Sequence, residues 1–417
     1  MSKRKHLIVG SGPAALSALD TIRSLNTDDE IRMVSKENTL PYCPAILPYL
    51  IAGRTTEKDI WLRDEDFFAR MQVTFERGKE VVQVLPDRKQ VVYRDGEVDR
   101  YDCLLIAAGA EPLPSPISSA DGLLKFHTLD DYRHLNSLLD GGKEVAVLGA
   151  GMVAVELAVA LAERGSKVKM IGRGRPLRAY FDEKAGGYIS DILTGHRVGI
   201  TTGKNISQIK KVSNGVEVLC ADGDVFNTDI LVSCLGVAPS LSLVKGTGIK
   251  ANQGILVDSK MMTSVENVYA AGDVAEALSF FDKRPGISAI LPNAIAQGKV
   301  AGANMAGKDD DYEGWLPMNV LKFFGHSAFS IGVAMPEDGE AEVLEEKDDS
   351  NKTFKRLVFR NGNLVGAMFV NIDVDPGVMK YVIERRLDIG NQKNALLEQP
   401  KEASCWLMLR TERNVAV

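Results

Sequence analysis

Short apolar runs alternate with longer amphipathic stretches over the first three quarters of the chain. An apolar run at residues 6–10 is followed by an amphipathic stretch at 13–25, and a run at 144–149 is followed by one at 151–164. Short apolar runs are typical of buried strands, and stretches with apolar residues on one face are typical of helices. Their alternation predicts βαβ units around a parallel sheet. Because the pattern occurs twice, we expect two similar α/β domains.

The pattern changes after about residue 313. Residues 353–359 (TFKRLVF) and 364–370 (LVGAMFV) are separated by a polar turn at 360–363, which predicts an antiparallel hairpin. The hairpin indicates a third domain of the α+β class. The polar run from Glu345 to Lys352 predicts a solvated loop beside it.

Composition adds few constraints on function. The chain has 417 residues, 45% of them hydrophobic, so it can bury more than one core. With 50 basic and 56 acidic residues the net charge is −6, which gives no electrostatic reason to expect nucleic acid or an anionic membrane as a partner. No apolar stretch reaches the roughly 18 residues that a membrane-spanning helix needs. We therefore expect a soluble protein.

The cysteines of the chain are scattered, without a CxxC pair or a group of cysteines and histidines. This spacing predicts no structural zinc, no iron-sulfur cluster bound by this chain and no disulfide framework of a secreted protein. A reducing cytoplasm is the expected location. The cysteines are Cys43, Cys103, Cys220, Cys234 and Cys405.

A glycine-rich turn follows the first predicted strand and opens the first predicted helix. Gly10 permits the tight turn, Gly12 leaves room for a pyrophosphate, and the small Ala15 lets helix and strand approach closely. The amides and the positive dipole end of the helix then face the phosphates. An acid that binds the ribose is expected after the second strand, and since Ser35 stands at the strand end, Glu37 is the candidate. A single turn of this kind also occurs for packing alone.

The second copy of this turn stands between another predicted strand and helix. Its small residues are Gly149, Gly151 and Ala154. Two such turns in the same local context predict two bound dinucleotides. The acid expected after the following strand is again missing, because Gly172 stands there, followed by Arg173 and Arg175. Two interpretations are open: arginines that face the 2′-phosphate of NADPH, and arginines on a polar surface loop.

Two related segments end in turns of small residues. Residues 104–112 (LLIAAGAEP) form a predicted strand followed by Ala108 and Gly109, and residues 230–239 (ILVSCLGVAP) repeat the arrangement in the later half. Each segment predicts a crossover between domains.

A third segment brings an acid to the end of a strand. The predicted strand at 268–271 delivers Gly272-Asp273 to the start of a helix. There Asp273 can accept a hydrogen bond from a polyol hydroxyl while the helix N-terminus faces a phosphate. The alternative is an Asp273 that only caps the helix.

The order of these motifs resembles the FAD-dependent pyridine nucleotide-disulfide oxidoreductase superfamily over essentially the whole chain. Three segments are similar to its branch of rubredoxin reductases and assimilatory nitrite reductases, namely Leu40-Pro41-Tyr42, residues 319–324 (NVLKFF) and 364–367 (LVGA). The resemblance implies an oxidoreductase with FAD in one domain and NAD(H), or alternatively NADP(H), in a second. It implies hydride transfer between the two and exchange of single electrons with an iron-sulfur protein or subunit. A hetero-oligomer or a homodimer is expected.

The expected fold class is α/β, with two Rossmann-like dinucleotide-binding domains plus a C-terminal α+β domain. We expect the FAD-binding domain to comprise residues 1–113 and 245–312, and the NAD(P)-binding domain to comprise residues 114–244. Residues 313–417 are expected to form the C-terminal α+β interface domain.

The resemblance also implies roles for single residues. Glu156 matches an acid near the flavin and the nicotinamide, and the alternative is a glutamate on a helix surface. The branch often has an arginine after the Pro-Tyr pair and a lysine that faces the flavin N5. This chain has Pro44 and Tyr49 at those places, so the usual lysine-glutamate pair is in question. The residues implied to hold FAD are Gly10, Gly12, Ala15, Glu37, Ala108, Gly109, Gly272 and Asp273, and those implied for NAD(P)H are Gly149, Gly151 and Ala154.

Cys43 is the candidate for thiol chemistry. Disulfide reductases of the superfamily need two cysteines near the first helix, and this chain has no such pair. NADH oxidases, NADH peroxidases and coenzyme A-disulfide reductases use one thiol before a Leu-Pro-Tyr-like segment. Cys43 precedes Leu47-Pro48-Tyr49, but Pro44-Ala45-Ile46 lengthen the spacing. Two interpretations are open: a redox-active Cys43 and an inert thiol.

Overall fold

The computed structural model describes residues 3–115, 117, 121–139, 142–337, 339–403 and 405. The chain divides into two compact units. The first unit comprises Met1–Ile46, Thr55–Leu113 and Val237–Leu316, and the second comprises Leu47–Arg54, Pro114–Gly236 and Pro317–Val417. Each unit contains a five-stranded parallel sheet of its own.

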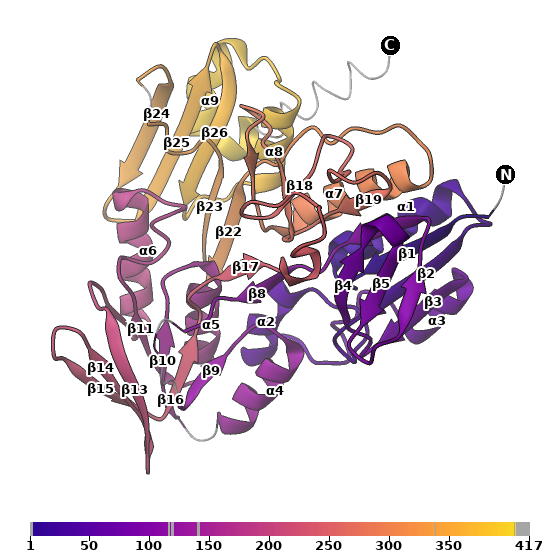
Figure 1. The fold of residues 1–417 in the computed structure, drawn as a ribbon. Helices are drawn as coiled ribbons and strands as arrows, with labels where there is room; N and C mark the ends of the chain where they lie inside the picture. Colours follow the sequence, from indigo (N-terminus) through magenta and orange to yellow (C-terminus); the bar gives the residue numbers. More distant parts are fainter. Residues whose placement is uncertain are drawn as a thin grey trace. The chain divides into compact units, whose positions relative to one another are not determined.

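The parallel sheet of the first unit has the strand order β19-β7-β1-β2-β3, and β19, β1, β2 and β3 are labelled in Figure 1. Its strands are β1 (Lys5–Val9), β2 (Glu30–Ser35), β3 (Val73–Arg77), β7 (Cys103–Ile106) and β19 (Val268–Ala270). Leu7 and Ile8 of the central β1 are both fully buried. Because successive side chains of a strand point to opposite faces, the sheet is covered on both sides.

Two helices of the first unit pack backbone against backbone. They are α1 (Pro13–Leu25), which follows the first glycine turn, and α7 (Leu291–Met305). A Cβ at Gly298 would lie 2.9 Å from the carbonyl carbon of Ala14, and one at Gly302 would lie 2.8 Å from the Cα of Ala18. Only glycine permits so close an approach. A segment late in the sequence therefore positions the helix of the first turn.

Smaller sheets complete the first unit. An antiparallel sheet contains β4 (Val81–Leu85), β5 (Gln90–Tyr93) and β6 (Val98–Arg100), and another sheet contains β18 (Ile255–Leu256), β20 (Ala275–Leu278) and β21 (Pro285–Gly286). β8 (Ala110–Pro112) pairs with β17 (Val237–Pro239), where the sequence leaves this unit and returns to it. The remaining helix is α3 (Glu65–Arg70).

The second unit repeats the same plan, with the strand order β12-β11-β10-β16-β9. The strands are β9 (Leu123–Lys125), β10 (Glu144–Leu148), β11 (Lys167–Ile171), β12 (Val198–Thr201) and β16 (Ile230–Ser233). The helices are α2 (Leu47–Ile51), α4 (Leu129–Leu138), α5 (Met152–Glu163) and α6 (Glu183–Gly195). An antiparallel sheet contains β13 (Ile206–Val212), β14 (Gly215–Cys220) and β15 (Val225–Thr228).

The C-terminal part of the second unit is an antiparallel sheet in the order β22-β23-β26-β25-β24 (Figure 1). Its strands are β22 (Met318–Phe323), β23 (His326–Gly332), β24 (Glu342–Asp348), β25 (Thr353–Arg360) and β26 (Asn363–Val370), and its helices are α8 (Pro376–Glu384) and α9 (Lys393–Glu398). The hairpin expected at 353–370 is confirmed. The loop expected from Glu345 to Lys352 is wrong in its first half, because Glu345–Asp348 belong to β24. This edge strand is largely exposed, so its polar sequence lacks the apolar alternation of a half-buried strand.

The fold class expected from the sequence is confirmed: two Rossmann-like parts and a C-terminal α+β part. Short 3₁₀ turns lie at Pro44–Ile46, Pro86–Arg88, Ser242–Val244 and Gly390–Gln392. Across the described residues, no helix has both the length and the apolar character needed to cross a lipid bilayer.

Candidate functional site

The first glycine turn forms an open cradle at the start of α1. Gly10 has φ 113°, and a Cβ there would lie 2.8 Å from the carbonyl carbon of Ala107. Its N–H donates to the carbonyl oxygen of Val34 at 2.8 Å, which ties the turn to the end of β2. Gly12 caps α1, and no atom lies within 4 Å of the place where its Cβ would stand. The free amides of the helix start are therefore accessible to a phosphate group.

Glu37 lies just beyond β2 and is held by a neighbouring tyrosine. The hydroxyl of Tyr42 donates to Glu37 Oε2 at 2.8 Å. Tyr42 is only 6% exposed and contacts Trp61 edge to face at 6.5 Å between ring centroids. The carboxylate is thus oriented on the same sheet edge as the glycine turn. The sequence indicated Glu37 but not its partner.

Gly272 and Asp273 emerge from β19 at the same edge. The N–H of Ala271 donates to the carbonyl oxygen of Ile106 at 3.1 Å, and Gly272, with φ 81°, donates to the side chain of Gln297 at 2.8 Å. The expected helix after Asp273 is wrong. The N–H of Ala275 closes a turn onto the carbonyl oxygen of Gly272, and the chain continues into β20. The role of Asp273 at a flavin polyol stays a prediction, without a helix dipole to support it.

Ala108 and Gly109 follow β7, which lies between β19 and β1 in the sheet. Gly109 has φ 67°, a conformation that favours glycine, and its carbonyl oxygen accepts from the N–H of Ser240 at 3.0 Å. The parallel register of β1, β7 and β19 brings the carboxyl ends of all three strands together. The first unit therefore gathers most of the residues that the sequence indicated for FAD at one sheet edge.

The second glycine turn repeats the geometry of the first. Gly149 has φ 134°, and a Cβ there would lie 2.9 Å from the carbonyl carbon of Cys234. Its N–H donates to the carbonyl oxygen of Ile171 at 2.9 Å, and Gly151 caps α5 with no atom within 4 Å of its Cβ position. Ala154 is fully buried beneath the turn. This turn too leaves an open helix start for a phosphate group.

The arginines after β11 have different surroundings. Arg175 donates to the carbonyl oxygen of Phe181 at 2.5 Å and to that of Pro176 at 3.2 Å. Burial lowers the pKa of its guanidinium from the ordinary value. Arg173 is exposed. Of the two arginines proposed for a 2′-phosphate, Arg175 instead holds its own loop together.

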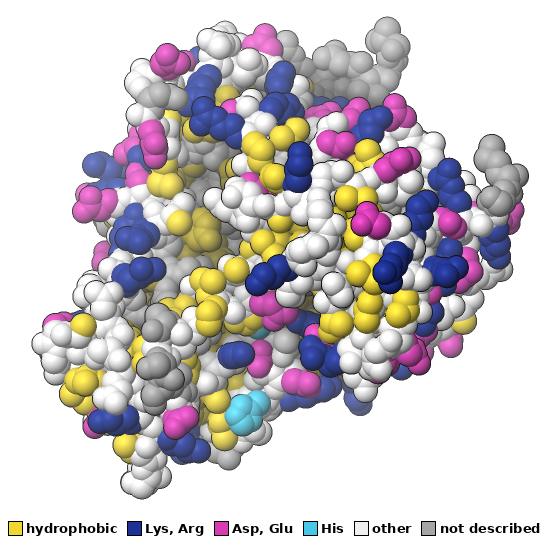
Figure 2. All heavy atoms as spheres, in the orientation of Figure 1, with side chains coloured by type: hydrophobic (Ala, Val, Ile, Leu, Met, Phe, Trp, Pro, Cys, Tyr) yellow, Lys and Arg dark blue, Asp and Glu magenta, His cyan; other side chains and the backbone are white. Residues whose placement is uncertain are grey.

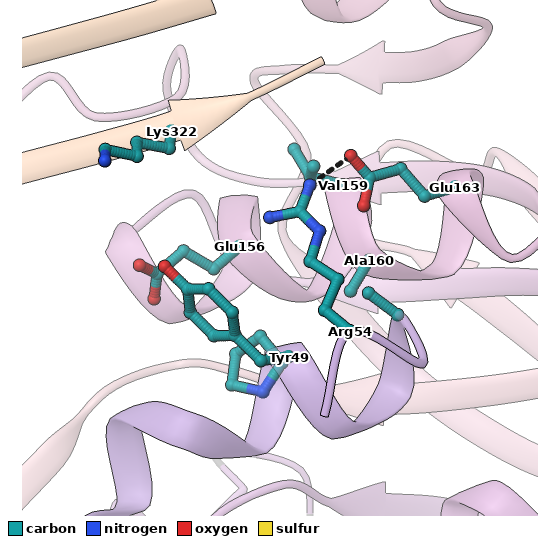
Figure 3. Close-up of a pocket in the computed structure, with 9 residues that line it drawn as sticks. Tyr49, Arg54, Glu156, Val159, Ala160, Glu163 and Lys322 are labelled. Atoms are coloured by element: carbon teal, nitrogen blue, oxygen red, sulfur yellow. Dashed lines mark hydrogen bonds and ion pairs between the residues drawn. The ribbon is translucent and has the colours of Figure 1, made fainter. Parts of the chain in front are cut away.

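Glu156 lines a pocket formed entirely within the second unit (Figure 3). It comes from α5, Tyr49 comes from α2, and Lys322 comes from β22. The side chain of Glu156 is half-buried, and burial raises the pKa of its carboxyl to about 7. At neutral pH this group is divided between its acid and carboxylate forms, as suits a group that takes up and releases a proton. The same pocket contains Arg54.

Arg54 organises one wall of this pocket. Its guanidinium forms an ion pair with Glu163 and lies 5.7 Å from the ring centroid of Tyr49 (Figure 3). Tyr49 is 37% exposed, so one side of the ring remains accessible. Sequence reasoning did not connect Lys322 with Glu156. A signal was present, however, because Lys322 stands between the buried Leu321 and Phe323 and so faces away from the C-terminal core.

Cys43 lies in the first unit, immediately before the 3₁₀ turn at Pro44–Ile46. Burial raises the pKa of its thiol, the N–H of Ala45 partly opposes this effect, and the charge of Asp273 adds to it. A thiol with a raised pKa is mostly protonated at neutral pH and is a poor nucleophile. No group of His, Cys, Asp and Glu in the described chain could hold a metal ion.

Two family models cover most of the chain. Residues 4–298 match the model of the pyridine nucleotide-disulphide oxidoreductases, and residues 317–377 match the C-terminal domain of rubredoxin NAD⁺ reductases. The chain belongs to the pyridine nucleotide-disulphide oxidoreductase family. It is an FAD-dependent NAD(P)H oxidoreductase, which confirms the resemblance found in the sequence. The open cradles at Gly12 and Gly151 fit the two nucleotides of this family.

Curated relatives in this family share much of the sequence. The chain is 35% identical over 418 residues to the epsilon subunit of NADH-dependent phenylglyoxylate dehydrogenase from Aromatoleum evansii, with 98% of each chain covered. It is 30% identical over 333 residues to the NADH-rubredoxin oxidoreductase of Clostridium acetobutylicum, covering 80% of this chain and 82% of the relative.

A solved structure has a similar fold. The covalent putidaredoxin reductase-putidaredoxin complex contains a chain that matches with a TM-score of 0.87 and 23% sequence identity, over 96% of this chain and 97% of the other. At this identity the match establishes the shared fold.

Proposed function

We propose that this chain transfers electrons between NAD(P)H and an iron-sulfur protein or subunit, with FAD in the first unit and the nicotinamide nucleotide in the second. The observation that carries the proposal is the pair of equivalent open glycine turns, one in each unit. When bound, FAD supplies a carrier that accepts two electrons as hydride and releases them singly. The proposed direction includes the reverse, reduction of NAD⁺ by a partner.

The FAD site is assigned to the carboxyl edge of the first sheet. Gly10, Gly12 and Ala15 shape the cradle for the pyrophosphate, and Glu37 accepts hydrogen bonds from the adenosine ribose. Asp273 binds the ribityl and phosphate region, and small residues from two strand ends lie at the same sheet edge. Those small residues are Ala108, Gly109 and Gly272. The expected domain of residues 1–113 and 245–312 contains all of them.

The nicotinamide nucleotide is assigned to the second turn. Gly149, Gly151 and Ala154 make room for its pyrophosphate at the start of α5. Glu156 lies in the first half of the same helix, and its pKa of about 7 lets it hold a proton near neutral pH. We assign to Glu156 the exchange of a proton beside the reacting rings. The expected domain of residues 114–244 contains these four residues.

The electrons leave through a docked partner in this proposal. Two relatives support it by name, one as a subunit of a dehydrogenase complex and one as a reductase of rubredoxin. On the face that Figure 2 shows, Lys and Arg side chains are interspersed with Asp and Glu. Residues 313–417 are proposed as the interface domain. We place the protein in the cytoplasm, where its free cysteines stay reduced.

Stopped-flow reduction of the FAD-loaded protein tests the proposal. NADH or NADPH should bleach the flavin absorbance rapidly, and reoxidation by a one-electron dye or a small iron-sulfur protein should follow. Cys43→Ser should change neither rate, because the thiol is protonated and has no described disulfide partner. A charge-transfer band that disappears in Cys43→Ser together with activity would assign the protein to the single-cysteine thiol or peroxide reductases, such as coenzyme A-disulfide reductase, instead.

A further inference from the structure

The loop after β11 is positively charged and lies directly against the second glycine turn. The N–H of Leu177 donates to the carbonyl oxygen of Ala150 at 2.7 Å. A Cβ at Gly172 would lie 3.1 Å from the Cβ of Ala150. Residues 172–181 contain three arginines and no carboxylate. The place where a ribose-binding acid would stand is therefore occupied by a glycine in a cationic loop.

Two of these arginines remain available to a ligand. Arg178 folds over Gly174, with its Nη1 3.2 Å from the place where a Cβ of that glycine would stand, and Arg173 precedes Gly174 in the chain. Both side chains are exposed, and neither has a hydrogen-bond or ion-pair partner among the described residues. Arg175, between them in sequence, is committed to backbone carbonyl groups.

Three nearby carboxylates are already paired. Asp182, which follows the loop, accepts from the N–H of Ala185 at 2.9 Å and forms an ion pair with Arg356. Lys204, whose N–H donates to the carbonyl oxygen of Gly172 at 3.3 Å, directs its amine to Asp222 and Asp224. No ion pair joins a described carboxylate to Arg173 or Arg178, although the charge of Glu183 also acts on this loop, at Arg175.

We propose that the second site selects NADPH over NADH, with Arg173 and Arg178 as the residues that bind the 2′-phosphate. The inference deepens the proposed function, because it assigns the nucleotide class of the same site. An acid at the end of β11 would accept from a ribose 2′-hydroxyl and repel a 2′-phosphate. Gly172 removes that repulsion, and two guanidinium groups provide charge-assisted hydrogen bonds to phosphate oxygens. Crowding by Ala150 also disfavours a larger side chain at position 172.

The test measures both binding and turnover. Titration calorimetry of the FAD-loaded protein should show 2′,5′-ADP binding at least about tenfold tighter than 5′-ADP, and kcat/KM should favour NADPH over NADH by a similar factor. Arg173→Ala and Arg178→Ala should each weaken 2′,5′-ADP binding by about tenfold and lower the ratio of kcat/KM for NADPH to that for NADH by a similar factor. Arg133→Ala, on α4 of the same unit, is the matched control and should change neither.

Two outcomes would overturn the inference. One is a kcat/KM that favours NADH, and the other is 2′,5′-ADP binding that both arginine variants leave unchanged. In either case rapid flavin reduction by NADH would still support the proposed function. Loss of reduction by both nucleotides would instead contradict the proposed function itself, so the two failures are distinguishable.

Discussion

The two glycine turns are closely similar in geometry although they share only their small residues. Gly10 and Gly149 have φ values of 113° and 134°, and a Cβ at either position would collide with the backbone at the end of a neighbouring strand. Gly12 and Gly151 both cap a helix with open space around them. Recognition of a pyrophosphate in both regions therefore depends on backbone geometry, which a few glycines determine.

The regions differ where side chains meet the sugar. The first presents Glu37, oriented by Tyr42, and the second presents Gly172 followed by Arg173. They differ again two residues beyond the small alanine of each helix. There α1 has Ser17, which donates to the carbonyl oxygen of Ile295 at 2.8 Å, and α5 has Glu156 in a pocket. The shared backbone thus holds phosphates, while the side chains give each region its own nucleotide and chemistry.

The largest expected effect comes from adding a side chain in the first glycine turn. Gly10→Ala should destabilise the protein by about 3 kcal/mol, because it combines a strained positive φ with a backbone collision. Thermal unfolding and flavin content after purification measure the result. Gly12→Ala is the control, since its Cβ meets nothing and its backbone is extended. It should keep the melting temperature of the apoprotein and lose only FAD affinity. Equal stability of both variants would show that the collision relaxes freely.

A substitution in the second turn should impair the use of NAD(P)H but not the binding of FAD. Gly151→Val should retain FAD but slow flavin reduction by NAD(P)H about a hundredfold, a loss of about 2.7 kcal/mol, because the branched side chain fills the space for the pyrophosphate. Stopped-flow absorbance measures the rate. Gly187→Val adds the same side chain to α6 of the same unit, also into open space, and should reduce normally. Unchanged reduction kinetics in Gly151→Val would contradict a nucleotide site at the second turn.

The sequence predicted the backbone part of this comparison better than the side-chain part. Gly10 and Gly149 were recognisable because only glycine tolerates those backbone conformations. The residue type alone therefore predicts the turn. The strands and helices around them followed from apolar periodicity. β24 did not, because an exposed edge strand has no buried face to produce such a pattern.

Contacts between distant residues account for what the sequence did not predict. Asp273 was expected at a helix start, but a turn that pairs the following residues with β18 prevails there. For Arg175 the sequence left two interpretations open, a 2′-phosphate ligand and a polar surface loop, and only the folded loop shows its contacts with the carbonyl groups of Phe181 and Pro176. Lys322 reaches the Glu156 pocket from another sheet. The local sequence pattern does not predict contacts between residues that are far apart in the sequence.

Glu156 gives a smaller effect that depends on pH. Because its folded pKa is raised from 4.5 to about 7, the neutral acid favours the folded state. The wild type should therefore lose stability as pH rises from about 4.5 to about 7, and then level off. Glu156→Gln keeps a neutral side chain and should be more stable than wild type by about 1 to 2 kcal/mol at pH 8, but equal to it at pH 4.5. Melting temperatures across this range measure the difference.

Two related variants sharpen this result. Glu163→Gln lies on the same helix but removes a paired carboxylate, so it should show no gain in stability at pH 8. Lys322→Gln should shift the midpoint of the Glu156 transition only slightly upward, because the ammonium is exposed to solvent. A pH-independent difference between Glu156→Gln and wild type would contradict the raised pKa.

The smallest expected effect concerns the hydrogen bond that orients Glu37. Tyr42→Phe keeps the ring and its contact with Trp61 but removes the hydroxyl donor, so the Kd for FAD should rise about fivefold, or about 1 kcal/mol. Flavin fluorescence titration measures the Kd. If the tyrosine acts through the carboxylate, Tyr42→Phe should add little to Glu37→Gln, because the two changes remove one shared interaction. Tyr93→Phe, which removes a hydroxyl bonded to Asp99 elsewhere in the first unit, should leave the Kd unchanged. Additive effects of Tyr42→Phe and Glu37→Gln would instead mean that the tyrosine supports the fold, and that Glu37 recognises the ribose without it.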